Sequence, residues 1–458
     1  MINSTVAAIS TARGKGGVAM IRISGPDALL VIKRVFVLPS GRDFSPEPRR
    51  VYYGSILRDG EIIDDATLTY FKAPHSYTGE DVCEICCHGG LYVTQAVLEA
   101  VLDSGATMAG AGEFTKRAYV NGKLTLSRAE AVGQVIDAVN DAQLRLSSSV
   151  RRGVLSDRLD GIKARMLDLI ARAYVIVDYP DEELPELERE TMALRLDEIY
   201  NELKRLKKTY RASRAVCEGI KTAIVGRPNA GKSSLYNALC GENLAIVTDI
   251  AGTTRDVIEN TVSVGNVTLR LADTAGIRET SDTVEKIGVE RARERLDSAE
   301  LVLCVFDASE EENDEDRELL LTISQRSAIA IINKSDMEKR MSPEFEAQIL
   351  ECAPRTVYIS AKSGGGIEEL ARVLDRMYEL DEIDLSNDAI ISNARQASSL
   401  NVALDRASEA RELLKIGESP DIVCFSLESA LASLEEIDAR QISEQIVNEI
   451  FSKFCVGK

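Results

Sequence analysis

The sequence has no long apolar run, and this absence limits where the protein can act. None of its 458 residues forms part of the roughly 20-residue apolar segment that a membrane-spanning helix needs, and no signal-peptide core follows the N-terminus. Nine cysteines, an odd number in a chain of this length, are typical of a reduced compartment rather than of a disulfide framework. We therefore predict a soluble, cytoplasmic protein with no membrane contact. The lack of tryptophan excludes nothing.

Positive charge is also scarce. The sequence has 55 Lys and Arg against 74 Asp and Glu, which gives a formal net charge of −19. This balance argues against a broad basic face that binds nucleic acid through many phosphates, so any RNA contact should be local or shared with a partner. One basic run on a predicted helix is either such a patch or, more simply, a solvated helix face. It consists of Lys204, Arg205, Lys207, Lys208, Arg211 and Arg214.

A second ligand pair is missing from the one cluster that suggests a metal site. Cys83, Cys86, Cys87 and His88 crowd one predicted strand, and no further Cys or His pair follows at zinc spacing. Alternation along a strand would also send Cys86 and Cys87 to opposite faces. We therefore predict buried structural cysteines here.

The strongest positive signal is a phosphate-binding loop at residues 226–234. It has the pattern G-x-x-x-x-G-K-[ST] between an apolar run at residues 222–225 and a predicted helix, whose N-terminal dipole end is positive. Glycines let backbone N–H groups face the phosphates, while Lys232 reaches the β and γ oxygens and Ser233 ligates Mg²⁺. The loop residues that we assign to the nucleotide are Asn229, Ala230, Gly231, Lys232, Ser233 and Ser234.

Three further motifs follow in order, each at the end of a predicted buried strand, where α/β folds bind ligands. The first, D-x-x-G, places Asp273 near Mg²⁺ and the Gly276 N–H near the γ-phosphate. The second is Asn-Lys-Ser-Asp at residues 333–336, in which the Asp336 carboxylate can accept from the N1–H and the amine of guanine together, a donor pair that adenine lacks. The third, Ser-Ala-Lys at residues 360–362, completes the base pocket. The motifs therefore predict GTP as the substrate and argue against an ATPase or a kinase. The predicted contacts are Asp273, Thr274, Ala275, Gly276, Asn333, Lys334, Asp336, Ser360, Ala361 and Lys362.

Glutamine is absent where Ras-like enzymes use it. They orient the attacking water with a Gln directly after D-x-x-G, but this position is the apolar Ile277. No arginine finger is evident in cis, although Arg255 and Arg278 lie near along the chain, and a cation there would stabilise charge on the bridging oxygens. The acidic candidates in the following segment are Glu279, Asp282 and Glu285.

Hydrophobic patterning predicts a multidomain α/β and α+β protein of about three domains. Residues 1–118 alternate β-like and helical pieces, as in an α+β domain. Residues 119–215 and 379–458 contain long charged helices, predicted at 129–144, 186–214, 393–414 and 422–439. Residues 216–378 alternate strands and helices as a doubly wound sheet requires. The simplest organisation is a helical domain interrupted by an inserted nucleotide domain whose ends lie close together.

The last five residues run from Phe454 to Lys458. Cys455 is fourth from the end, but Val-Gly-Lys is not the tail of a prenylation box. A cysteine followed by Gly-Lys is unusual for a structural terminus. Frayed residues are the alternative, and the residues alone leave the two open.

The whole chain resembles the family of tRNA-modification GTPases known as MnmE or TrmE, which are K⁺-dependent relatives of Era. The resemblance rests on the phosphate loop, the switch segment at residues 246–256 and the terminal Cys-x-Gly-Lys, which is the most particular to this family. It implies a Ras-like P-loop GTPase domain inserted into the helical domain. It also implies that the N-terminal domain is similar to tetrahydrofolate-binding domains and holds a homodimer.

The same resemblance implies a catalytic arrangement. Asn229 would bind K⁺ where an arginine finger would otherwise act, and Thr254 would join Ser233 on Mg²⁺. The family's general base, twelve positions after the Asp of D-x-x-G, falls on Glu285. Pairing of two GTPase domains would complete the K⁺ site, with Thr248, Ile250 and Thr253 as further ligands, and would move the helical domains. The switch residues assigned to the nucleotide are Thr248, Asp249, Ile250, Ala251, Gly252, Thr253 and Thr254.

The resemblance further implies chemistry on tRNA. Such enzymes install an aminomethyl-type group, for example carboxymethylaminomethyl, on C5 of the wobble uridine of certain tRNAs. They use a 5-formyl- or methylene-tetrahydrofolate unit and a FAD-containing partner, MnmG, in a heterotetramer-type complex. Cys455 would be a reactive thiol. Basic side chains can pair with folate carboxylates and a Glu can accept from the pterin, although an ordinary surface charge is the alternative for each. The implied folate positions are Arg22, Glu84, Lys123 and Lys458.

A GTPase that assembles ribosomes, binding ribosomal RNA and modifying nothing, is the competing interpretation. It shares the phosphate loop and the switch segment, but it should carry a second GTPase domain or a basic C-terminal domain. This sequence has one set of GTPase motifs and an acidic helical C-terminal region. The sequence therefore favours the modification enzyme.

Overall fold

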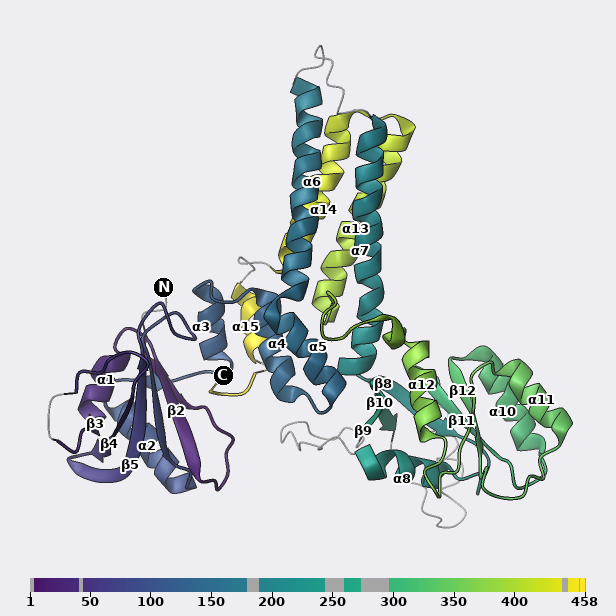
Figure 1. Cartoon of the computed structure of the whole chain (residues 1–458), viewed down its shortest axis with the longest axis horizontal. Helices are drawn as coiled ribbons and strands as arrows, with labels where there is room; N and C mark the ends of the chain where they lie inside the picture. Colours follow the sequence, from purple (N-terminus) through teal and green to yellow (C-terminus); the bar gives the residue numbers. More distant parts are fainter. Residues whose placement is uncertain are drawn as a thin grey trace. The chain divides into compact units, whose positions relative to one another are not determined.

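The computed structural model describes residues 4–40, 44–178, 189–243, 259–272, 296–438, 444–452 and 454–457 of the chain. Its contacts divide the chain into two compact units (Figure 1). The first unit contains Met1–Gly133 together with Leu431–Lys458, and the second contains Gln134–Ala430. The segments that begin and end the sequence therefore fold together.

Among the described residues, a seven-stranded sheet forms the body of the first unit. Its strands lie in the order β3-β4-β5-β6-β2-β1-β7, and β1 and β7 pair in parallel while the other neighbours are antiparallel. The strands are β1 (Val6–Ile9), β2 (Val18–Ser24), β3 (Phe36–Val37), β4 (Val51–Arg58), β5 (Glu61–Phe71), β6 (Val82–His88) and β7 (Thr107–Met108).

Helices α1 (Ala28–Val35) and α2 (Leu91–Asp103) pack on one face of this sheet. Alternation along β2 sends Ile21 and Ile23 to that face, where they are fully buried in one core with Val31 of α1 and Val97 of α2. A smaller core around Phe451 joins helices α3 (Glu113–Val120), α4 (Leu126–Asp137) and α15 (Glu444–Ser452). The predicted α+β class of this part is confirmed.

The second unit contains most of the predicted helical region, whereas residues 119–133 and 431–458 of that region belong to the first unit. Helices α6 (Val154–Asp178), α7 (Arg189–Cys217), α13 (Ala394–Ile416) and α14 (Pro420–Ile437) run side by side (Figure 1), and the shorter α5 (Asp141–Arg152) precedes them. The Tyr174 hydroxyl of α6 donates to Glu428 of α14 over 2.9 Å. No described helix is both long enough and apolar enough to cross a membrane.

The prediction of one helix over residues 129–144 is wrong. The chain leaves helical geometry after Asp137 and begins α5 at Asp141. Asn140 has extended backbone angles, and its side chain accepts from the Gln143 N–H over 2.8 Å, while Gln143 Oε1 accepts from the Val139 N–H over 2.9 Å. These two bonds satisfy N–H groups at the new helix start, so the break is favoured although the apolar periodicity continues through it.

In the described parts of the chain, a six-stranded sheet lies between the two halves of the helical region in sequence. Its order is β13-β12-β11-β8-β10-β9, and every pair is parallel except β9 with β10. The strands are β8 (Ile220–Val225), β9 (Glu259–Val264), β10 (Val267–Ala272), β11 (Leu301–Asp307), β12 (Ala328–Asn333) and β13 (Thr356–Tyr358). Every residue of β11 and β12 is buried, as expected for parallel strands covered on both faces.

Among the described residues, this inserted region contains α8 (Lys232–Asn243), α10 (Asp314–Gln325), α11 (Pro343–Cys352) and α12 (Ile367–Met377), followed by the short η2 (Leu380–Glu382). Helices α10 and α11 share a core with β11 and β12, in which Phe306 and Phe345 meet edge to face at 6.0 Å. Strand β8 lies between β10 and β11, so the strand order reverses there. Ligands of open α/β sheets bind at the carboxyl end of such a strand.

The chain enters and leaves this region at neighbouring points. Near the end of α7, Thr209 accepts from the Ile391 N–H over 3.1 Å and Ser213 donates to the Ile391 carbonyl. The Arg211 guanidinium also lies 5.7 Å from the centre of the Tyr378 ring. A mainly parallel sheet with its helices is therefore inserted into a helical region, as predicted.

The start of α5 contacts the hairpin formed by β9 and β10. The buried Gln143 amide donates to Thr268 Oγ1 of β10 over 3.2 Å and to the Val216 carbonyl over 2.8 Å. Thr268 in turn donates to the same carbonyl over 2.7 Å, and Asn140 donates to Ser263 of β9 over 2.7 Å. Hydrogen bonds thus join the helical region to β10, the strand that directly precedes the D-x-x-G motif in sequence.

Candidate functional site

The phosphate loop leaves β8 at the reversal point of the sheet. Gly226 has φ +156°, and a Cβ there would lie 2.4 Å from the Val305 carbonyl oxygen of β11. Gly231 has φ +97°, and a Cβ there would lie 2.0 Å from the amide nitrogen of Asn333. Only glycine permits these close approaches, so steric overlap explains why both positions of the motif are glycine.

Lys232 begins α8 and folds back over the loop. Its ammonium group donates to the carbonyls of Gly226 and Arg227, each over 2.7 Å. An ammonium has three donors, so these bonds leave one for a phosphate oxygen. Burial lowers the pKa of Lys232, which is the expected effect of desolvating a cation.

Asn333 joins three of the predicted motifs. Its buried side chain donates to the Ala230 carbonyl over 2.9 Å and accepts from the Ala361 N–H over 3.0 Å. The structure thereby brings together the phosphate loop, the Asn-Lys-Ser-Asp motif and the segment at residues 360–362. These contacts of Asn333 with the two other motifs were not predicted. The predicted contact of Asn333 with the nucleotide stays a prediction.

Lys334 is held by a residue that sequence reasoning missed. Its ammonium group lies 2.5 Å from the carboxylate of Asp307, which ends β11 and is almost fully buried. Burial opposes ionisation of Asp307, but hydrogen bonds from Lys334 and Ser309 outweigh it and lower the pKa. The available signal was an apolar strand that ends in Asp and lies beside the strand of the Asn-Lys motif.

Asp336 lies exposed beside the segment at residues 360–362. Its pKa is lowered chiefly by a hydrogen bond from the buried Ser360 side chain, and also by its own backbone N–H and the charge of Lys362. The carboxylate is therefore ionised at neutral pH, as an acceptor for two guanine donors must be.

Several predicted residues lie outside the described residues. They are Thr248, Asp249, Ile250, Ala251, Gly252, Thr253, Thr254, Asp273, Thr274, Ala275, Gly276, Glu285 and Lys458. Ser233 and Ser234 are described at the start of α8, next to Lys232.

In the first unit, the structure brings together two of the predicted folate residues. Arg22 of β2 pairs with Glu84 of β6 at 2.8 Å, and its guanidinium lies 5.5 Å from the ring centres of both Tyr77 and Phe114. Lys123 donates to the Pro74 carbonyl over 3.0 Å, at the start of the loop that carries Tyr77. The charged pair is therefore flanked by two aromatic rings.

A fully buried arginine supports this arrangement and was missed by sequence reasoning. Arg117 of α3 lies 3.0 Å from Glu80 and 2.8 Å from Glu113, and it donates to the Ser4 carbonyl over 2.7 Å. A charged residue is expected at the surface unless paired, and no local pattern reveals partners that are distant in sequence. Removing a buried charge of this kind would leave two carboxylates uncompensated.

Residues 454–457 are bound to the first unit rather than frayed. Val456 forms a β-bridge with Ala111, the Gly112 N–H donates to the Cys455 carbonyl over 3.3 Å, and Ser10 donates to the Gly457 carbonyl over 2.9 Å. The Cys455 side chain stays exposed. The tail therefore fixes its backbone and leaves the thiol accessible.

Gly457→Ala is expected to release this tail. Gly457 has φ +98°, and a Cβ there would lie 2.2 Å from the Ile9 carbonyl oxygen. The left-handed conformation alone costs a residue with a Cβ about 1–2 kcal/mol. Amide hydrogen exchange at Gly112 should become faster in Gly457→Ala but not in the control Val456→Ala, whose side chain is half exposed. Equal exchange in the two variants would contradict the assignment.

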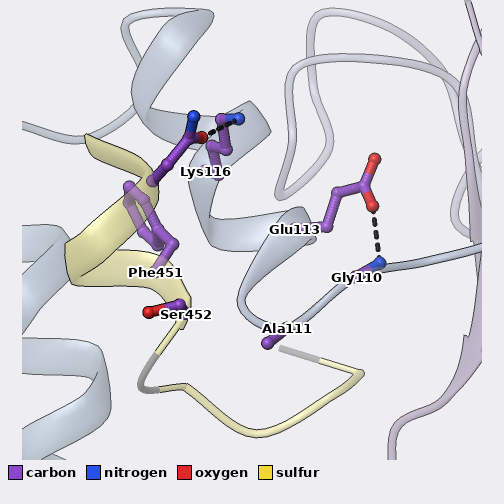
Figure 2. A pocket seen from close by; sticks show the side chains of 7 residues that line it. Gly110, Ala111, Glu113, Lys116, Phe451 and Ser452 are labelled. Atoms are coloured by element: carbon purple, nitrogen blue, oxygen red, sulfur yellow. Dashed lines mark hydrogen bonds between the residues drawn. The ribbon is translucent and has the colours of Figure 1, made fainter. Parts of the chain in front are cut away.

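A cavity of about 330 Å³ lies beside the tail, between α3 and α15 (Figure 2). Its polar groups already satisfy one another. Glu113 accepts from the Gly110 N–H over 2.7 Å, Lys116 donates to Asn448 over 2.7 Å, and Ser452 donates to the Glu449 carbonyl over 2.8 Å. We interpret it as a packing gap rather than as a ligand site.

Two of the three clustered cysteines are buried, as predicted, and the third is not. Cys83 and Cys87 are buried on the core face of β6, whereas Cys86 is on the opposite face and half buried. Burial raises the pKa of Cys83 and raises that of Cys87 to about 11. Within the described parts of the chain, no group of three His, Cys, Asp or Glu residues is placed to hold a metal ion.

Comparisons with known proteins agree on one family. A model of the MnmE helical domain matches residues 126–455, and a model of the N-terminus of the GTP-binding protein TrmE matches residues 5–123. The tRNA modification GTPase MnmE of Carboxydothermus hydrogenoformans is 40% identical over 462 residues, with 100% of both chains covered. That of Clostridioides difficile is 39% identical over 458 residues, with the same coverage.

Solved structures match smaller shares of the chain. The G domain of the iron transporter FeoB from T. maritima is 28% identical and covers 35% of this chain and 98% of its own, with a TM-score of 0.25. Era of Aquifex aeolicus is 27% identical and covers 40% of this chain and 65% of its own, with a TM-score of 0.27.

Proposed function

Since the chain belongs to the MnmE family of tRNA modification GTPases, and is a GTP hydrolase, we propose that it acts on C5 of the wobble uridine in certain tRNAs. The group installed would be of the aminomethyl type, such as carboxymethylaminomethyl. The proposed setting is the cytoplasm, and the proposed partner is the FAD-containing MnmG, in a heterotetramer-type complex. The proposed domains are residues 1–118, 119–215, 216–378 and 379–458.

The phosphate loop supports GTP binding. Two of the three Lys232 donors fix the lysine over its own loop, and the third is left for the β- and γ-phosphates. Ser233 stands at the N-terminus of α8, where the helix dipole favours an anion. With Thr254 it would hold Mg²⁺, which neutralises phosphate charge when bound.

The base pocket supports guanine. Asp336 is ionised, and Ser360 and Lys362 lie beside it. A carboxylate accepts from two neighbouring donors, and guanine presents N1–H and an amine at the required edge. Asn333 links this pocket to the phosphate loop, so base and phosphates are read by one connected structure.

Hydrolysis needs a group that Ile277 cannot supply. We propose Glu285 as the general base that orients the attacking water. Asn229 has φ +63°, a conformation that Asn adopts more readily than most residues, and its amide oxygen suits a hard cation. K⁺ held there with Thr248, Ile250 and Thr253 would supply positive charge beside the bridging oxygens. Pairing of two GTPase domains would complete that site.

The first unit supports a folate site. The Arg22–Glu84 pair offers both signs of charge between two aromatic rings, which suits a flat heterocycle with amidine-like donors and a carboxylate tail. Lys123 and Lys458 are the further basic residues that we propose for the tetrahydrofolate derivative. Cys455, exposed on a bound tail, is the proposed reactive thiol.

The meeting of three motifs on Asn333 is the observation that carries the proposal. Its first test is GTP hydrolysis in K⁺ and in Na⁺ at equal ionic strength. We expect hydrolysis to be about tenfold faster or more in K⁺, because a cation positioned at the bridging oxygens lowers the barrier. Equal rates in both salts would contradict the K⁺ mechanism and favour an assembly GTPase.

Modification itself is tested by adding tRNA, MnmG, a 5-formyl- or methylene-tetrahydrofolate as the carbon donor, and ammonium or glycine as the source of the nitrogen in the installed group. Nucleosides from the tRNA are then separated and weighed by mass spectrometry. A C5 aminomethyl-type uridine should appear only when GTP and the partner are both present. If GTP is hydrolysed but no new nucleoside appears, the assignment as a GTPase is retained and the proposed tRNA modification is contradicted.

A further inference from the structure

The second residue of the phosphate loop directs its side chain away from the nucleotide side of the loop. Arg227 is almost fully buried. Its guanidinium donates to the Glu311 carbonyl and to the Glu310 carboxylate, each over 3.1 Å, and lies 3.3 Å from the carboxylate of Asp316. A side chain of the loop is therefore bound to the segment between β11 and α10.

Asp316 is a rigid partner because it belongs to the cap of α10. Its carboxylate accepts from the Asn313 N–H over 3.2 Å, and its own N–H donates to the Asn313 side chain over 3.0 Å. Burial raises the pKa of Asp316, an effect that the charge of Arg227 opposes. The guanidinium is thus held by a carboxylate that cannot move without breaking the helix cap.

The pair is poorly explained by stability alone. Arg227 Nε and Asp316 Oδ1 are buried and have no hydrogen-bond partner among the described residues. Buried ion pairs with unsatisfied atoms contribute little net stability, and apolar side chains of similar size often do as well. The geometry of the loop offers a different reason.

The carbonyl of Arg227 is one of the two that receive the Lys232 ammonium group. It also accepts from the Ala230 N–H over 3.4 Å, so it sits at the centre of the loop. Asn333 holds the later half of the loop through the Ala230 carbonyl. The Arg227 side chain is the matching contact on the earlier half.

We infer that Arg227 is a positioning residue for the phosphate lysine: its side chain, held by the start of α10, fixes the carbonyl that directs Lys232. Arg227 does not touch the nucleotide in this arrangement. It acts through Lys232, and α10 becomes part of the support of the phosphate site. The inference rests on the proposed phosphate contact of Lys232.

The test combines an apolar replacement of the pair with a double-mutant cycle. In Arg227→Met with Asp316→Leu, the buried charges are replaced together and one of the two cap bonds of α10 is lost, so we expect the temperature of thermal unfolding to fall by a few degrees at most. Equilibrium affinity for a fluorescent GTP analogue should nevertheless fall about tenfold, since the fork of charged hydrogen bonds that fixed the loop is lost. Asp314→Asn, in the same first turn but exposed, is the matched control and should bind as the parent does.

The cycle separates positioning from general support of the fold. In a protein that already carries Lys232→Met, the additional change Arg227→Met should not weaken binding of the GTP analogue further, because the ammonium group that Arg227 positions is absent. If the two residues acted independently, their losses of affinity would multiply in the double variant. That result, or an unchanged affinity in Arg227→Met with Asp316→Leu, would overturn the inference. If Lys232→Met alone binds GTP as the parent does, the proposed phosphate site itself fails, which is a different result.

A second variant covers the case in which the apolar pair does not fold. Arg227→Lys keeps the charge and the pairing with Asp316, but one nitrogen cannot reach three acceptors in a planar fork. Its affinity for the GTP analogue should fall between that of the parent and that of Arg227→Met. Affinity equal to the parent would mean that the charge alone suffices and would contradict a directional contact.

Discussion

Asp336→Asn is expected to weaken GTP binding about a thousandfold and to create affinity for xanthosine triphosphate. The amide would place an N–H₂ group against the N1–H and the amine of guanine, so two charged hydrogen bonds are lost and donors face donors. Xanthine carries a carbonyl where guanine carries the amine, and the new amide can donate to it. Losses of affinity of about this size or larger are found when a binding site and its ligand no longer offer matching hydrogen-bond donors and acceptors.

Competition of each triphosphate against a fluorescent guanine nucleotide measures the change. Glu338→Gln removes an acidic charge two residues away, also exposed, and should leave the preference for guanine intact. Because the Ser360 side chain donates to the Asp336 carboxylate and helps to hold it in place, Ser360→Ala should show a weaker form of the same loss. Unchanged GTP affinity in Asp336→Asn would remove the base-pocket assignment.

Glu285→Ala is expected to reduce the rate of GTP hydrolysis by a hundredfold or more while GTP binding stays within about twofold. A positioned general base contributes about 10²–10⁴ to a rate, and Ile277 offers no substitute. The loss should be seen at saturating GTP in K⁺, because a missing base changes the chemical step and not the binding of the nucleotide.

The neighbouring acids supply the controls. Glu279→Ala and Asp282→Ala remove the same charge from the same segment and should hydrolyse GTP at nearly the parent rate. If one of them is the inactive variant instead, the base has been assigned to the wrong carboxylate. If all three remain active, water is oriented by another group and the family resemblance fails at this position.

Local patterns in the sequence predicted the strands and the motifs. The apolar runs at residues 222–225 and 328–332 end where the phosphate loop and the Asn-Lys-Ser-Asp motif begin, and both lie within strands of the structure, β8 (Ile220–Val225) and β12 (Ala328–Asn333). Apolar runs and motifs of this kind consist of neighbouring residues, so they can be recognised in a single sequence without knowledge of the fold. The break at Asn140 also had a local signal, an Asn with a Gln three residues later, which is a capping pattern that the apolar periodicity concealed.

The supporting contacts could not be predicted in the same way. Arg227 pairs with Asp316, Lys334 with Asp307 and Arg117 with Glu80, each across 27 residues or more. A charged residue in a sequence is indistinguishable from a solvated one until the fold brings its partner near. The motifs name the groups that would touch GTP, whereas the residues that hold those groups in place become visible only in three dimensions.

The contact between α5 and the β9–β10 hairpin connects the helical region directly to the sheet that carries the phosphate loop. By thermodynamic reciprocity, if GTP changes how α5 is held, then whatever shifts α5 changes the affinity for GTP by the same factor. The bonds from Gln143 and Asn140 end on Thr268 and Ser263, away from the phosphate loop. On that condition, a small molecule that separated α5 from the hairpin would change the affinity for GTP without binding at the phosphate loop.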